Sequence, residues 1–265
     1  QFPYMMYLRG VNIHGHISSC GGSIIHQSWG VTSARCTANR VNLMIRAGMV
    51  NINQPRLYLE TNVYFTAPEY MDELQPINQP HDISVVRFPQ AITFNNFIQP
   101  IRLMRSADMN RNCAGVRMTT SGWGTTTDLV GAGSDTLNWT HLVGVTNFVC
   151  LLVFNNAFIV RDSTICAGPY NITSQSICSG DSGVPLTVVD DDGRLSQVGV
   201  GSFVSGFGCG AGLPNGFVRP GHYHTWIRQV TGINFDWNLS AADAVKSSDV
   251  VPQKPLKMLE LLKKH

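Results

Sequence analysis

The residues best suited to chemistry lie in the stretch SQSICSGDSGVPL, residues 174 to 186. Ser182 stands between Asp181 and Gly183, four residues after Cys178, and its hydroxyl is a potential nucleophile. Glycines suit such a turn because backbone N–H groups must approach a developing oxyanion with no Cβ in the way. The stretch therefore indicates a serine nucleophile beside an oxyanion-binding turn.

A second stretch, WGVTSARCTANR at residues 29 to 40, closes an apolar run on Cys36. Arg35 directly precedes that cysteine. An arginine stays protonated with a pKa above about 12 and has no lone pair to accept a proton. The sequence leaves two interpretations of Arg35, an ordinary surface charge or a residue standing where a catalytic group belongs.

The elements that must position these residues are short. Runs rich in Val, Ile, Thr and Phe recur between turn residues and predict many antiparallel strands, hence a barrel or a sandwich. The runs are 41–49, 83–88, 115–123, 142–153, 184–189 and 197–204. The pattern favours an amphipathic helix only at HYHTWIRQV, residues 222 to 230.

The composition bounds the class of protein. The chain has 265 residues, of which 43% are hydrophobic and 14% charged, as expected for a well-buried globular protein. A net charge of +2 gives no electrostatic case for nucleic-acid binding, and no run of 18 apolar residues predicts a membrane span. All five lysines lie in the last twenty residues. The arginine-only body suits a strongly alkaline fluid, or it reflects codon usage.

Cysteine usage and sequons indicate the compartment. The seven cysteines form no C-x-x-C pair, and N-x-[ST] sequons begin at Asn138, Asn171 and Asn238. These features favour a secreted, disulfide-bonded glycoprotein with no metal and no cofactor. The absence of a signal peptide indicates a mature or shortened sequence. Residues 238–255 read as a polar linker, and 255–265 as a short amphipathic helix or a frayed tail.

Further motifs follow in a fixed order: CGGSIIHQSWGVTSARC (20–36), HDISVVRF (81–88), SGWG (121–124), STICAG (163–168) and GVGSFVSGFGC (199–209). With GDSG, they make the chain resemble the chymotrypsin-like (trypsin-fold) serine proteases over residues 1–233. The stretch GSFVSGFGCGAGLPNGF resembles the arthropod chymotrypsin and collagenase-like branch.

The resemblance implies an all-β fold of two six-stranded antiparallel barrels, about 1–105 and 113–220. A helix at about 221–231 and a C-terminal extension, 234–265, would follow.

Site residues carry over from the family by position. Ser182 matches the nucleophile, and Asp82 matches the buried acid that orients the general base. Gly180 and Ser182 would supply the oxyanion-hole N–H groups, and Ser202 matches the serine that supports the acid. The family pairing of cysteines implies the disulfides Cys20–Cys36, Cys150–Cys166 and Cys178–Cys209. Cys113 is left as a buried thiol or as an intermolecular link that makes a covalent dimer.

The general base is where the chain departs from the family. The family pattern T-A-A-H-C reads Thr-Ser-Ala-Arg-Cys here, so Arg35 occupies the position of the catalytic histidine. A base needs a pKa near the working pH, which arginine lacks. We therefore expect an Arg35–Asp82 ion pair beside Ser182 and an inactive homologue. His26 and His81 are the nearest candidates for a substitute base.

Three further positions bear on the site. The primary specificity pocket would have Ser176 at its base and Asn215 on its far wall, with Ser202 and Val204 nearby, an uncharged chymotrypsin-like pocket. Val184 replaces a family glycine and adds a side chain to a tight segment. Asp181 pairs in the family with the ammonium of an Ile-Val-Gly-Gly terminus, which the sequence does not contain, so it needs another partner.

Three functions are compatible with these residues. The first is a secreted, inactive homologue that binds a protein or peptide, for example a protease inhibitor or another protease. The second is a weak or conditional chymotrypsin-like endopeptidase in an alkaline digestive fluid such as a gut lumen. The third is a structural or coat protein that reuses the fold.

Overall fold

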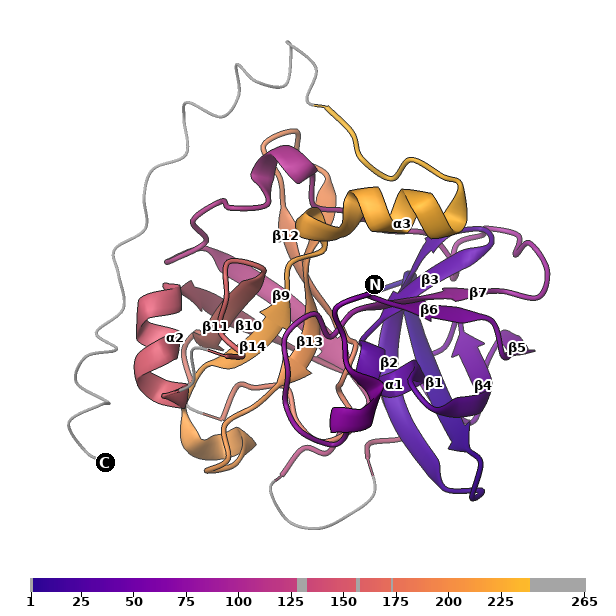
Figure 1. Ribbon diagram of the computed structural model, residues 1–265, viewed down its shortest axis with the longest axis horizontal. Coiled ribbons are helices and arrows are strands. Elements are labelled where there is room, and N and C mark those ends of the chain that lie inside the picture. Colours follow the sequence, from indigo (N-terminus) through magenta and orange to yellow (C-terminus); the bar gives the residue numbers. More distant parts are fainter. Residues whose placement is uncertain (1, 128–132, 156–157, 173, 239–265) are drawn as a thin grey trace.

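A computed structural model describes residues 2–127, 133–155, 158–172 and 174–238, and it holds two mainly antiparallel sheets side by side (Figure 1). The first sheet has the strand order β5-β4-β1-β2-β3-β7-β6. Its strands are β1 (Met5–Asn12), β2 (Ile17–His26), β3 (Trp29–Thr32), β4 (Arg40–Ala47), β5 (Leu57–Thr61), β6 (Tyr64–Thr66) and β7 (Ser84–Arg87). Among the described residues no ladder joins β5 to β6, so this half is a half-barrel rather than the expected closed barrel.

The second sheet closes on itself. Its order is β12-β9-β10-β11-β14-β13-β8, and a β12–β13 pairing joins six of the strands into a barrel. The strands are β8 (Arg102–Leu103), β9 (Arg117–Gly122), β10 (Asn138–Val145), β11 (Thr164–Pro169), β12 (Pro185–Val189), β13 (Leu195–Phe203) and β14 (Asn215–Val218). The short β8 pairs parallel to β13, so it belongs to this sheet although it falls within 1–105. The all-β trypsin-like fold is thus confirmed, with one barrel closed.

The helices are short. They are α1 (Ala34–Thr37), α2 (Asn147–Phe154) and α3 (His224–Thr231), with 3₁₀ turns η1 (Asp72–Leu74), η2 (Ser106–Asp108), η3 (Cys209–Ala211) and η4 (Pro220–Tyr223). The predicted C-terminal helix is α3, preceded by η4. None of the described helices is both long and apolar enough to cross a bilayer.

The strand prediction for 142–153 is wrong over its second half. The chain leaves β10 at Val145 and enters α2, where the Val149 N–H donates to the capping Thr146 Oγ1 at 3.3 Å. Cys150 holds the helix to β11 through its disulfide to Cys166. Periodicity missed α2 because its solvent side is also apolar, with Phe148 69% exposed.

One continuous hydrophobic core joins the two sheets. A separate apolar cluster lies in the first half, where the alternation in β4 buries Leu43, Ile45 and Ala47. A buried hydrogen bond of 2.5 Å from Ser23 Oγ in β2 to Gln197 Oε1 in β13 links the halves. The relative position of the two sheets, on which the site depends, is therefore fixed by packing and by buried polar bonds.

The chain after α3 returns to the body. Trp237 Nε1 donates to the Leu103 carbonyl at 2.8 Å, and the Arg102 guanidinium lies 3.7 Å from the Trp237 ring centroid. The first residues of the predicted extension thus pack on the second sheet. The predicted linker beyond 238 and the predicted helix 255–265 lie outside the described residues.

Candidate active site

Ser182 lies in the turn between the Cys178–Cys209 disulfide and β12. Gly180 and Gly183 flank it with φ of 93° and 85°, a region that favours glycine. A Cβ at Gly183 would also lie 2.2 Å from Thr32 Oγ1. The Ser182 carbonyl accepts the Gly21 N–H at 2.8 Å. The glycines of GDSG thus serve both the left-handed turn and its close approach to the first sheet.

The turn leaves its polar groups open. In the described part of the chain, no acceptor engages the N–H groups of Gly180 and Ser182, and the Ser182 hydroxyl makes no hydrogen bond. Ser182 itself is partly exposed to solvent. The two N–H groups expected to form an oxyanion hole are therefore available to a bound oxygen.

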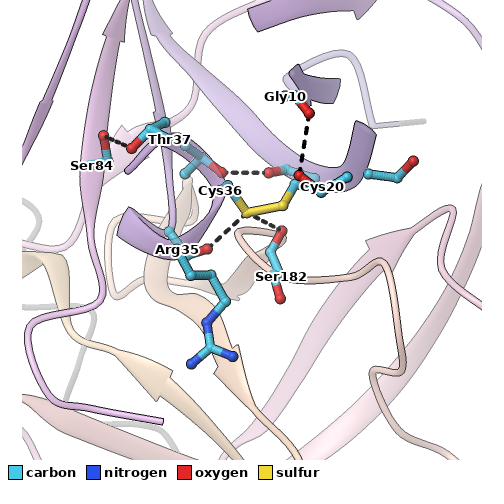
Figure 2. The surroundings of a disulfide bond; sticks show 12 residues. Gly10, Cys20, Arg35, Cys36, Thr37, Ser84 and Ser182 are labelled. Atoms are coloured by element: carbon cyan, nitrogen blue, oxygen red, sulfur yellow. Dashed lines mark hydrogen bonds between the residues drawn. A yellow bond between two sulfur atoms is a disulfide. The ribbon is translucent and has the colours of Figure 1, made fainter. Parts of the chain in front are cut away.

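Arg35 and Asp82 form the expected ion pair. Asp82 is fully buried, and its Oδ2 accepts Arg35 Nε at 2.8 Å and the Ser202 hydroxyl at 2.7 Å. Its Oδ1 accepts the backbone N–H of Arg35 at 2.8 Å. Figure 2 shows the Arg35 side chain extending past the Cys20–Cys36 disulfide on the side where Ser182 lies. Arg35, Asp82, Ser182 and Ser202 thus come together as their positions in the sequence predicted.

A residue that the sequence did not single out completes the pair. Asn78 Oδ1 accepts a hydrogen bond from Arg35 Nη2 at 2.9 Å, so the guanidinium is held at two points. Asn78 lies in an exposed loop with no periodicity, and no motif distinguishes it from its neighbours. Only the path of the loop reveals this contact.

The two candidate substitute bases are engaged elsewhere. His81 has a left-handed backbone with φ of 61°, and its Nδ1 lies 2.9 Å from the Tyr223 hydroxyl. Burial lowers the pKa of His81. His26 Nδ1 accepts the Ser28 N–H at 3.1 Å. Neither imidazole is hydrogen-bonded to the nucleophile or the acid in the described residues.

Asp181 finds backbone partners. It is 8% exposed, and its carboxylate accepts the N–H groups of Gly124 at 2.8 Å and Cys178 at 2.9 Å. Burial raises the pKa of Asp181 to about 6, and the two hydrogen bonds oppose that rise. A cavity of about 240 Å³ borders the carboxylate, with Ser176 and Trp139 among its walls.

Val184 fits because glycines surround it. A Cβ at Gly21 would lie 2.4 Å from Val184 Cγ1, and Cβ atoms at Gly122 and Gly201 would lie 3.0 and 3.1 Å from its methyl groups. The side chain therefore fills space that these glycines leave, and it is fully buried. The added side chain is accommodated rather than strained.

The predicted pocket residues are partly brought together. Ser176 Oγ lies 2.8 Å from Asn215 Oδ1, and the Nδ2 of Asn215 is buried without an acceptor among the described residues. Ser202 is turned to Asp82. Val204 is half-buried and packs against the core. The walls carry no charge from these four side chains.

The cysteines pair as the resemblance implied, Cys20–Cys36, Cys150–Cys166 and Cys178–Cys209. Cys113 is a free, buried thiol, 5% exposed, and burial raises its pKa. That burial fits the buried-thiol alternative and counts against an intermolecular link. The sequon residues Asn138, Asn171 and Asn238 are exposed.

The fold and the site together define a chymotrypsin-like protein. The defining features are the two joined β-sheets, the turn of Ser182 packed against the first sheet, and the buried hydrogen bond between Asp82 and Ser202. A family model described as Trypsin matches residues 1–227. Collagenase of Hypoderma lineatum is 34% identical over 224 residues, 82% of this chain and 77% of that protein. Brachyurin of Leptuca pugilator is 31% identical over 216 residues, 81% of this chain and 88% of that protein.

A solved structure described as HL collagenase superposes with a TM-score of 0.75 at 29% identity, covering 88% of this chain and 94% of that chain. The chain belongs to the trypsin family of serine endopeptidases.

Proposed function

We propose that this protein is a secreted member of the trypsin family that has lost peptidase activity and acts by binding a protein or peptide. The observation that carries the proposal is the Arg35 guanidinium, held by Asp82 at 2.8 Å and by Asn78 at 2.9 Å. In the family this place belongs to the general base. Here it is filled by a cation that has two partners of its own.

The chemistry of Arg35 explains the loss. Acyl transfer needs a group that takes the Ser182 proton and returns it to the leaving amine. A guanidinium donates five N–H groups and accepts none, so it cannot take that proton. Loss of a triad member lowers turnover by about 10⁴ to 10⁶ in related chemistry. Asp82 then neutralises Arg35 instead of orienting a base.

The remaining site still suits a ligand. The N–H groups of Gly180 and Ser182 have no acceptor within the described residues, so they can bind a carbonyl oxygen. Ser176 and Asn215 add uncharged polar groups, which suit an apolar side chain better than a basic one. A protease inhibitor or another protease would present such a segment in extended form. We therefore take a protein or peptide to be the ligand.

The proposed location is extracellular. Three disulfides require an oxidising compartment, and exposed Asn138 and Asn171 are accessible to glycosylation. The absence of lysine before residue 246 agrees with an alkaline fluid such as a gut lumen.

The test is covalent labelling of Ser182. The purified protein is treated with an aromatic serine-directed phosphonate at pH 7.5 and pH 10, and intact mass is measured beside a Ser182→Ala control. We expect no mass increase at either pH, and no hydrolysis of peptides with large apolar residues. Stoichiometric labelling of Ser182 at pH 7.5 would contradict the proposal.

One observation favours a second candidate, a weak endopeptidase active at high pH. The Ser182 hydroxyl is unpartnered and the oxyanion N–H groups are open, so hydroxide could replace the missing base. Labelling at pH 10 but not at pH 7.5, absent in Ser182→Ala, would support this candidate.

A further inference from the structure

A second cavity, of about 600 Å³, adjoins the serine turn. Ser179 and Gly180 form part of its wall, with Trp123 from the second sheet. The first sheet contributes Arg9 and Arg46. A volume of this size accommodates one or two side chains of a ligand.

Strand register places the two arginines on one face. Arg9 lies two residues from Tyr7 on β1, so their side chains share a face. Tyr7 is paired with Arg46 on β4, which brings the two guanidinium groups to the same side of the sheet. Both therefore face the cavity beside Gly180.

Most N–H groups of the Arg9 and Arg46 side chains have no acceptor in the described residues. Within the described residues, neither guanidinium lies within 4.0 Å of a carboxylate, and the Arg9 side chain makes no hydrogen bond. The Nε of Arg9 is also buried without an acceptor. Arg46 donates to the Ile52 carbonyl at 2.9 Å and keeps its other N–H groups. Asp135, the acidic residue among the cavity walls, is exposed and paired with neither.

Some of the other arginines pair with acids within the described residues. The nitrogen–oxygen distances of three such ion pairs are 2.5 Å for Arg102–Asp192, 2.6 Å for Arg105–Asp108 and 2.8 Å for Arg111–Asp190. Arg40 and Arg87 also lack a carboxylate within 4.0 Å in the described chain, so what distinguishes Arg9 and Arg46 is that they share one cavity and that the Arg9 Nε is buried without an acceptor. A carboxylate satisfies a guanidinium through short, charge-assisted hydrogen bonds.

We propose that this cavity binds an acidic side chain, Asp or Glu, of the protein or peptide segment that occupies the cleft. The inference rests on the proposed binding function and names the ligand chemistry of that site. Gly180 belongs to both places, the cavity wall and the oxyanion-binding turn. Since an extended chain advances about 3.3 Å per residue, the acidic residue lies within about four residues of the one facing Ser182.

The test uses labelled nonapeptides with a central Phe. Glu or Gln is placed in turn at each of the four positions on either side, and affinity is measured by fluorescence polarisation. The proteins are the wild type, Arg9→Gln and Arg46→Gln. The control is Arg87→Gln, which removes a charge from an exposed residue on β7 with no ion pair in the described chain.

We expect the Glu peptide to bind about tenfold more tightly than the Gln peptide at one position, because a hydrogen bond to a charged group adds that much affinity. The preference should disappear in Arg9→Gln and in Arg46→Gln, persist in Arg87→Gln and weaken with salt. Unchanged affinity for the Gln peptides shows that each variant is folded.

Other outcomes separate the two proposals. Equal binding of Glu and Gln peptides overturns the acidic-residue inference and leaves the binding function standing. Binding of no peptide contradicts both. A preference for the Glu peptide that persists in Arg9→Gln and in Arg46→Gln means that the carboxylate binds outside this cavity, and it overturns the inference. Arginine-dependent binding of a sulfated hexasaccharide, without any preference for Glu, assigns the cavity to sulfated glycans and also overturns the inference.

Discussion

Replacing Arg35 by methionine tests whether the Arg35–Asp82 pair stabilises the fold. Asp82 is fully buried, and its oxygens accept Arg35 Nε, the Arg35 backbone N–H and the Ser202 hydroxyl. Methionine keeps the unbranched stem of the side chain and the backbone bond, but it removes the charge, the 2.8 Å Nε bond to Asp82 and the 2.9 Å bond to Asn78. The variant therefore removes the whole guanidinium, and combining it with Asp82→Asn isolates the contact with Asp82.

The expected cost follows from what remains around Asp82. Removing one partner of a buried ion pair costs about 3–5 kcal/mol, because a buried charge is left uncompensated. The Arg35 side chain is 23% exposed, and Asp82 keeps two hydrogen bonds. We therefore expect Arg35→Met to lower the free energy of unfolding by about 2–3 kcal/mol, at or below the lower end of that range.

Urea unfolding at pH 7.5 with intact disulfides gives the free energy of unfolding. The series is wild type, Arg35→Met, Asp82→Asn and the double variant, with Arg87→Met as the surface control, expected within about 0.5 kcal/mol of wild type. A double-mutant cycle should give a coupling energy above about 1 kcal/mol. A loss below about 0.5 kcal/mol in Arg35→Met, or no coupling, would refute the reasoning that Asp82 depends on this guanidinium.

Three more outcomes are expected. Arg35→His, combined with a free Ile-Val-Gly-Gly terminus, should raise hydrolysis of peptides at large apolar residues by about 10³-fold or more, since imidazole supplies the base; a wild-type rate equal to that of the variant would contradict this. Asp181 has a raised folded pKa of about 6, so the native state binds more protons than the unfolded chain between about pH 4 and pH 6. Its contribution to the free energy of unfolding should fall by about 3 kcal/mol as pH rises through that window, a slope that Asp181→Asn lacks in urea titrations. Cys113 should react with a disulfide reagent only in denaturant and leave a monomer on non-reducing gels, because its thiol is buried; rapid labelling of the native protein would sink this expectation.

Features carried by short motifs could be predicted from the sequence. The disulfide pairs and the convergence of Arg35, Asp82, Ser182 and Ser202 follow from motif order, since the family fold brings these segments together. The helix α2 could not be predicted from periodicity, because its exposed face is apolar and a disulfide holds it in place. The half-barrel shape of the first sheet was equally hidden, since closure depends on whether β5 and β6 meet.

By itself, the sequence determined the class of fold, the serine turn and the presence of an arginine directly before Cys36, because these depend on residue type and order. Tertiary structure alone decided that Asn78, in a loop without a motif, also binds the Arg35 guanidinium. It also decided that Val184 fits among three glycines and that Arg9 and Arg46 face one cavity without an ion pair to any described acid. The physical reason is the same in each case. Packing, pairing and desolvation depend on which distant segments meet, and local sequence does not encode those distances.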